Sequence, residues 1–189
     1  MRRPFLVCLM LILALSLSYA GNDRPKFILL ISEQNIAGPQ HAWWASVIDL
    51  SATESAVAQK LIDQGYTVIE LSSVSKVIKE DRAFRMVDLS EAASVRLGNS
   101  SKADYVVLGK ALASSGGNVP QSNMRSCFAN ITAKLIRVKD SKVIAYLEAA
   151  GSSVHMDAVT GGKEALANAG ADLAAKLVDK IIRDQEGGK

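Results

Sequence analysis

The chain has 189 residues, of which 22 are basic and 19 acidic, so its formal net charge is only +3. This length suffices for one well-packed domain. Arg2 and Arg3 lie in an expected leader, and their removal lowers the net charge to +1. Such a weak charge implies neither nucleic acid nor an anionic membrane surface as a partner.

Residues 1–20 form a predicted secretory signal peptide. Arg2 and Arg3 are its basic start, Phe5 to Ser16 is an uncharged apolar core, and Ala20 is the small residue after which we expect cleavage. The apolar run is shorter than the roughly 20 residues that span a bilayer. We therefore expect a single periplasmic domain over residues 21–189, with no stable membrane insertion after cleavage.

The domain begins with a strand, a helix and a second strand. Lys26 to Ile31 is an apolar run without alternation, which is typical of a strand covered on both faces. Ser51 to Glu54 has the form of a capping box, and Gly65 supplies the stop of the following helix. Tyr66 to Leu71 is the second strand. This order predicts a βαβ unit with parallel pairing.

Two helices are predicted before the next strand. A short one lies near Ser75 to Glu80, and a clearer one covers Asp88 to Gly98, with Ser90 at its start. The pattern then changes from helical spacing to extended segments.

Three extended segments predict an antiparallel meander. Tyr105 to Ala113 is apolar, and Ser126 to Val138 alternates, with Cys127, Ala129, Ile131, Ala133 and Leu135 on one face. Lys142 to Ala150 repeats that alternation after a short turn. Alternation of this kind places one face against the core and the other in water.

A long C-terminal helix is expected to cover the sheet. Its apolar positions recur at helical spacing between Gly162 and Arg183, namely Leu166, Ala169, Leu173, Leu177 and Ile181. We expect a disordered tail over 184–189. The fold class predicted is α/β (α+β): a single-layer mixed sheet of about five strands, a βαβ unit followed by a three-stranded meander, packed with helices.

Groups that could perform catalysis are sparse. Neither His41 nor His155 has a second metal-ligating residue at a usual spacing, and Thr160 to Lys163 does not match the phosphate-binding loop pattern. Cys127 is the only cysteine after leader removal, so no internal disulfide can form, and a buried strand position is expected for it. We expect no enzymatic activity, no metal and no cofactor.

Two segments interpreted as loops are candidate partner-binding surfaces. The first carries Pro39, His41, Trp43 and Trp44, and the second, 114–124, carries Asn118, Pro120 and Asn123. The two tryptophans are expected to pack on the core edge, and the alternative is an aromatic contact patch.

Polar residues beyond the first strand allow a different class of function. Glu33, Asn35 and Gln40 follow that strand at its carboxyl end, where open α/β sheets often bind ligands. Glu33, Asn35 and His41 would then serve a small hydrolase or a ligand-binding protein. The polarity of a loop explains the same residues.

Three phrases of the sequence resemble a group of bacterial envelope domains. They are Gly65 to Glu70, Ala103 to Lys110 and Ile131 to Ala145. The group includes the middle domain of the flagellar assembly protein FlgT, the amino-terminal domain of TolB, the curli secretion protein CsgG and the lipoprotein activators of penicillin-binding proteins. This chain lacks the lipobox cysteine of the lipoprotein members.

The resemblance implies a non-enzymatic periplasmic interaction module that binds another envelope protein or its own copies. Flagellar assembly, as for FlgT, is the first expectation. Regulation of a penicillin-binding protein, or a curli-type secretion role, is the alternative.

Overall fold

A computed structural model describes residues 24–41, 51–70 and 90–187, with only the backbone at 38–41. The expected leader, Trp43, Trp44 and the helix expected near Ser75 to Glu80 lie outside the described residues. No helix in the described ranges is long and apolar enough to cross a membrane.

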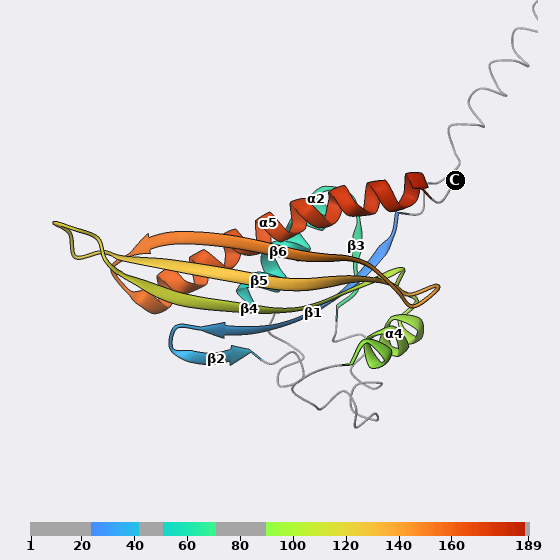
Figure 1. The fold of residues 1–189 in the computed structure, drawn as a ribbon, viewed down its shortest axis with the longest axis horizontal. Coiled ribbons are helices and arrows are strands. Elements are labelled where there is room, and N and C mark those ends of the chain that lie inside the picture. The colour runs from blue at the N-terminus through green and yellow to red at the C-terminus, as the bar shows by residue number, and fades with distance from the viewer. Residues whose placement is uncertain (1–23, 42–50, 71–89, 188–189) are drawn as a thin grey trace, which may run out of the picture.

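The described residues form one mixed sheet with helices packed on it (Figure 1). The elements in chain order are β1 (Lys26–Asn35), β2 (Gly38–His41), α2 (Ala52–Asp63), β3 (Thr67–Val68), α4 (Glu91–Ser100), β4 (Tyr105–Asn118), β5 (Arg125–Arg137), β6 (Lys142–His155) and α5 (Ala158–Gly187). The sheet order is β2-β1-β4-β5-β6, and β3 also pairs with β1.

The predicted βαβ unit and meander are both confirmed. β3 and β4 pair parallel with β1, whereas β4, β5 and β6 pair antiparallel. The Ser51 hydroxyl accepts a hydrogen bond from the Glu54 amide at 3.1 Å and so caps α2, and Gly65 follows the helix with φ +81°. Ser90 caps α4 in the same way.

The core lies on both faces of β1, as its apolar run predicts. Phe27, Leu29 and Ile31 belong to a large cluster with α2 and α5, whereas Ile28 and Leu30 belong to a smaller cluster under α4. Figure 1 shows α5 passing behind the long strands β4, β5 and β6. It shows α4 at the end of the sheet away from the projecting β4–β5 hairpin.

The long helix packs as its periodicity predicts. Its five expected core positions are all fully buried: Leu166, Ala169, Leu173, Leu177 and Ile181. Gly170 permits close approach to α2, because a Cβ there would lie 2.8 Å from the Thr53 carbonyl oxygen. Together these contacts fix α5 against both the sheet and α2.

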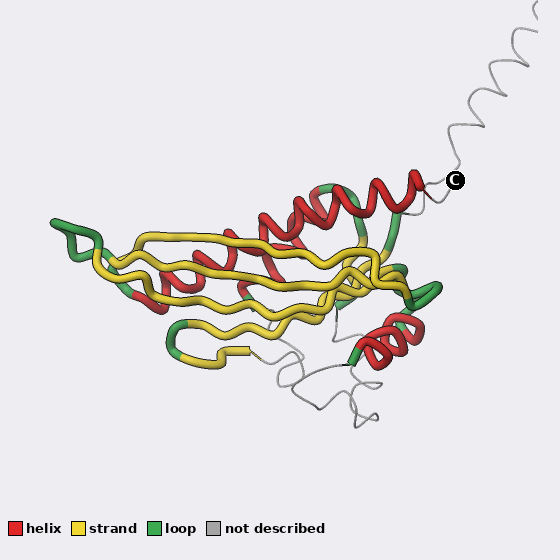
Figure 2. Tube along the Cα trace, viewed as in Figure 1, coloured by secondary structure: helices red, strands yellow, loops and turns green. Residues whose placement is uncertain are grey.

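The structure differs from the prediction in two segments that the sequence analysis interprets as loops, because parts of both are paired strands. β1 continues to Asn35, and β2 pairs with it over Gly38 to His41, so Pro39 and His41 lie on a strand. β4 stays paired with β5 to Asn118, and a bulge at Gly116 accommodates one extra residue. Figure 2 shows the resulting hairpin projecting beyond the rest of the sheet.

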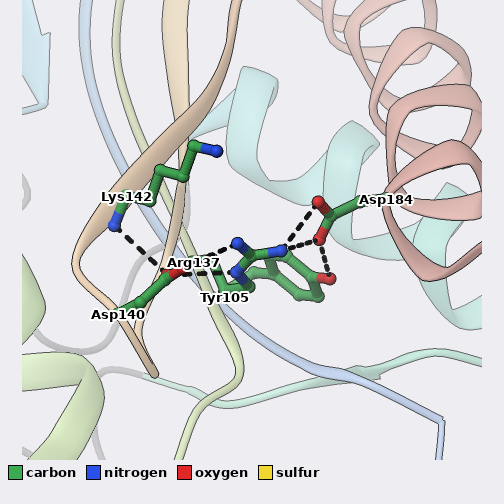
Figure 3. Close-up of polar contacts among 5 residues, drawn as sticks. All are labelled: Tyr105, Arg137, Asp140, Lys142 and Asp184. Carbon is green, nitrogen blue, oxygen red and sulfur yellow. Dashed lines mark hydrogen bonds and ion pairs between the residues drawn. The ribbon is translucent and has the colours of Figure 1, made fainter. Parts of the chain in front are cut away.

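The C-terminal end of α5 is held by a polar cluster (Figure 3). The Arg137 guanidinium donates to Asp184 at 2.8 and 2.9 Å and to Asp140 at 2.6 Å, and the Tyr105 hydroxyl donates to Asp184 at 2.8 Å. α5 therefore continues through Asp184 to Gly187, where the sequence predicts a disordered tail.

Hydrogen bonds and burial in this cluster shift the pKa values of Asp140 and Tyr105. The hydrogen bond from Arg137 lowers the pKa of Asp140 to about 2. Burial, together with the hydrogen bond to Asp184, holds the pKa of Tyr105 well above its usual range. The cluster therefore keeps a neutral phenol beside ion-paired carboxylates at neutral pH.

Replacing Asp184 by alanine is expected to loosen the end of α5. The variant leaves Arg137 without its helix partner and removes the three hydrogen bonds that Asp184 accepts from Arg137 and Tyr105, which costs about 1.5–3 kcal/mol. Amide hydrogen exchange should accelerate over residues 181–187 and little elsewhere. Asp179→Ala, at an exposed position of the same helix, is the control, and equal exchange in the two variants would contradict the role given to Asp184.

Candidate functional site

Two of the polar residues proposed for catalysis, Glu33 and Asn35, form hydrogen bonds with backbone groups. Glu33 is 6% exposed, and its carboxylate accepts the Thr53 amide at 2.8 Å. Asn35 is 1% exposed, donates to the Val159 carbonyl at 3.0 Å and accepts from the Ile36 amide at 2.7 Å. These groups join the end of β1 to the starts of α2 and α5, which favours a structural role over the hydrolase hypothesis.

A second buried carboxyl, Glu54, lies beside the gap between β3 and β2 on the outer side of β1. It accepts the Ile31 amide at 3.0 Å, a group that no strand on that side reaches in the described residues. Burial raises the pKa of Glu54 from its ordinary 4.5 to about 7, partly offset by hydrogen bonds from Ile31 and Ser51, and nearby Glu33 adds to the rise. Glu54 thus completes the β1 edge and caps α2.

The glycine-rich start of α5 is a packing site. The Asp157 carboxylate accepts from the Thr160 amide at 2.8 Å and so caps the helix, while His155 Nδ1 accepts from the Asp157 amide at 3.0 Å. A Cβ at Gly161 would lie 2.7 Å from the Cys127 sulfur. Cys127 itself is a buried free thiol, as predicted.

No group of three or more metal-ligating side chains occurs within residues 24–37, 51–70 and 90–187, whose side chains the structure describes. Of the candidate partner-binding residues that the structure describes, Pro39 and Asn118 lie apart. Pro39 pairs with Gln34, which lies opposite Leu112, whereas Asn118 stands six residues further along β4. At about 3.3 Å per residue, the two segments are separated by roughly 20 Å. Pro120 and Asn123 are exposed at the hairpin end.

The face of β4, β5 and β6 opposite α5 exposes several large apolar side chains. Three lie on that face by their register, Leu112, Phe128 and Val154, with exposed fractions of 51%, 46% and 50%. Met124 and Met156 are also exposed, immediately beyond the last strand pair. We call these five residues the apolar end. The ends of β4 and β5 nearest these residues run toward the projecting hairpin, away from α4 (Figure 1).

The part of the same face that lies nearer α4 carries charged side chains. The Lys134 ammonium pairs with Glu91 of α4 and lies 5.4 Å from the centroid of the Tyr146 ring, and Tyr146 is 72% exposed. The next row across the strands contains Lys110 and Glu148. Charge therefore separates the apolar end from the part of the face that α4 contacts.

The outer edge of β6 is closed by side chains of α5. Asn168 donates to the Ser152 carbonyl at 2.9 Å, and Asp172 accepts the Ala150 amide at 3.2 Å. Lys176 donates to the Glu148 carbonyl at 2.8 Å. The spacing matches because four helical residues rise about 6 Å and two strand residues about 6.7 Å. This edge is therefore not free to pair with another strand there.

No protein-family model matches the chain, and no curated protein matches it. Solved structures similar to it include the C-terminal domain of LpoB from Salmonella enterica, with 15% identity over 72% of this chain and 90% of that chain and a TM-score of 0.42. Lipoprotein GNA1162 from Neisseria meningitidis shares 13% identity over 87% and 99%, with a TM-score of 0.43.

The hypothetical protein CT253 from Chlamydia trachomatis has 12% identity over 84% of this chain and 95% of that chain, with a TM-score of 0.49. At these identities and TM-scores the likeness assigns neither a partner nor an activity to this chain. The specific resemblance to FlgT, TolB and CsgG remains a prediction.

The sequence interpretation missed Phe128 and Val154. Phe128 has the same parity on β5 as Asn130 and Thr132, which the alternation already assigns to the water-facing side. An aromatic residue on a water-facing side indicates a contact with another protein, and the sequence alone already placed Phe128 there. Val154 was missed because β6 continues five residues beyond the expected end at Ala150.

Proposed function

We propose that this protein is a non-enzymatic interaction module of the bacterial envelope, and that the apolar end is where it binds another protein. The observation that carries the proposal is the group of large apolar side chains on a sheet face that no described helix covers at that end. Exposed apolar groups gathered in this way are typical of protein interaction sites.

The buried polar groups support the same proposal. Glu33, Glu54 and Asn35 are engaged in backbone hydrogen bonds, and these contacts explain why they are buried without invoking a reaction. The predicted signal peptide supports export to the periplasm. The sequence phrases favour flagellar assembly or regulation of a penicillin-binding protein as the process served.

Phe128→Ser is expected to reduce partner capture about three- to tenfold, since Phe128 is 46% exposed and burying that remaining half contributes about 0.8–1.5 kcal/mol. Tyr146→Ser is the matched control, because it removes an exposed aromatic ring from the same face outside the apolar end. The measurement is a crosslinked pull-down from the periplasm of the native cell, with partners quantified by mass spectrometry.

Enrichment of flagellar basal-body proteins, or of cell-wall synthases, by the wild type and the Tyr146 variant but not by the Phe128 variant would support the proposal and identify the process. Equal enrichment by all three folded proteins would refute the binding surface. Release of a bound small molecule from the purified protein, lost in Glu33→Gln, would instead favour the ligand-binding alternative.

A further inference from the structure

The apolar end lies in an uncharged part of the molecule. The strand stretches of this face, 111–118, 126–133 and 149–154, contain no Asp, Glu, Lys or Arg, and neither does the turn 119–124. The charged residues at its border are Arg125, which has the same parity on β5 as the core-facing Cys127, and Asp157, whose carboxylate caps α5. Partners of opposite charge therefore gain nothing here, whereas two copies of the same surface meet without like-charge repulsion. Neutrality favours a partner that carries the same kind of surface.

The side chains on this face alternate in size. One row across the strands is Ser114, Phe128 and Ser152, and the next pairs Ser126 with Val154. Leu112 lies in a row with Asn130 and Ala150. If two such faces meet about a two-fold axis that passes between these rows, the large side chains of one copy lie over the small ones of the other, within the roughly 10 Å between packed sheets.

We propose that a second copy of this chain docks on the apolar end, sheet face against sheet face, around a two-fold axis. This inference rests on the proposed function, in which the apolar end binds protein. Because α5 side chains already occupy the β6 edge at Glu148, Ala150 and Ser152, the second copy joins through the face and not by extending the sheet at that edge.

The expected dimer is weak. Three strands about 4.8 Å apart and seven residues of about 3.4 Å each give a flat contact of roughly 15 by 24 Å. Its area, about 360 Å², is less than the roughly 800 Å² that each partner buries in a standard interface. Such a small contact leaves little surplus over the entropy lost on association, so the dimer is expected to depend strongly on concentration. Association must therefore be measured over a wide concentration range.

The test is sedimentation velocity of the purified protein from about 1 to 300 µM. The weight-average mass should rise from one chain toward two across this range. Phe128→Ser and Val154→Lys should each weaken the dimer at least tenfold, the second by placing two like charges in the contact. Tyr146→Ser should leave the dissociation constant within about twofold. Circular dichroism and thermal unfolding of each variant establish that it is folded.

A mass of one chain at every concentration would overturn the inference, as would equal association of the wild type and both apolar-end variants. Its failure is distinguishable from failure of the proposed function. If the wild type is monomeric but Phe128→Ser still loses an envelope partner, the proposed function stands alone. If the dimer forms and both variants capture partners normally, the apolar end serves self-association and the partner surface lies elsewhere.

Discussion

Replacing Gly151 by alanine is expected to destabilise the fold by about 3 kcal/mol, because α5 packs directly on the backbone of β6 at this point. A Cβ at Gly151 would overlap the carbonyl oxygen of Ala165 and the amide nitrogen of Ala169. Both are helix backbone atoms, so a side-chain rotation cannot relieve the overlap. The helix must move away from the sheet.

The measurement is urea unfolding of the wild type and the variant, with Ser152→Ala as the control at the neighbouring exposed position. A displaced α5 should also weaken the hydrogen bonds that join β6 to Asn168, Asp172 and Lys176, and because the Ala150 amide donates to Asp172, its exchange should accelerate. Unfolding of Gly151→Ala within about 0.5 kcal/mol of the wild type would contradict the close contact.

Glu54→Gln is expected to change how stability depends on pH. The folded protein holds the pKa of Glu54 at about 7, above its ordinary 4.5, because burial disfavours the charged form. Below pH 4.5 the carboxyl is protonated in both states, and there is no penalty. As the pH rises toward 7 the unfolded state releases its proton more readily, so the wild type loses about 3 kcal/mol of stability through this group.

Glutamine stays neutral and keeps an oxygen that can accept the Ile31 amide. The variant should therefore gain about 3 kcal/mol relative to the wild type between pH 4 and pH 8, measured as the difference of their unfolding free energies at each pH. Taking the difference cancels titrations that both proteins share. A difference that stays constant from pH 4 to pH 8 would show that Glu54 does not resist ionisation in the folded state.

The sequence predicts the parts of the fold that depend on regular burial. The unbroken apolar run of β1 predicts cover on both faces, and the spacing from Leu166 to Ile181 predicts the buried face of α5. Each signal is local to one element and repeats several times along it. The capping box at Ser51 is local in the same sense.

Features that depend on residues far apart in the sequence cannot be predicted from such local patterns. Gly38 and Pro39 are typical of a loop, yet they belong to β2, because the chain turns back after Asn35 and pairs with β1. Ser114 to Asn118 has weak strand propensity, and its pairing with β5 keeps it extended. The bond from Ile31 to Glu54 needs a gap in the sheet edge that no local pattern reveals.

The most direct test of the interaction surface places a photo-crosslinking phenylalanine analogue at position 128 in cells that make the protein. The control position is Ile62, which is 52% exposed on α2, away from the open face. We predict a crosslinked product at 128 and none at 62 after irradiation, with either an envelope protein or a second copy of this chain attached. Absence of any product at 128, or the same products from both positions, would contradict the central claim that the apolar end binds protein.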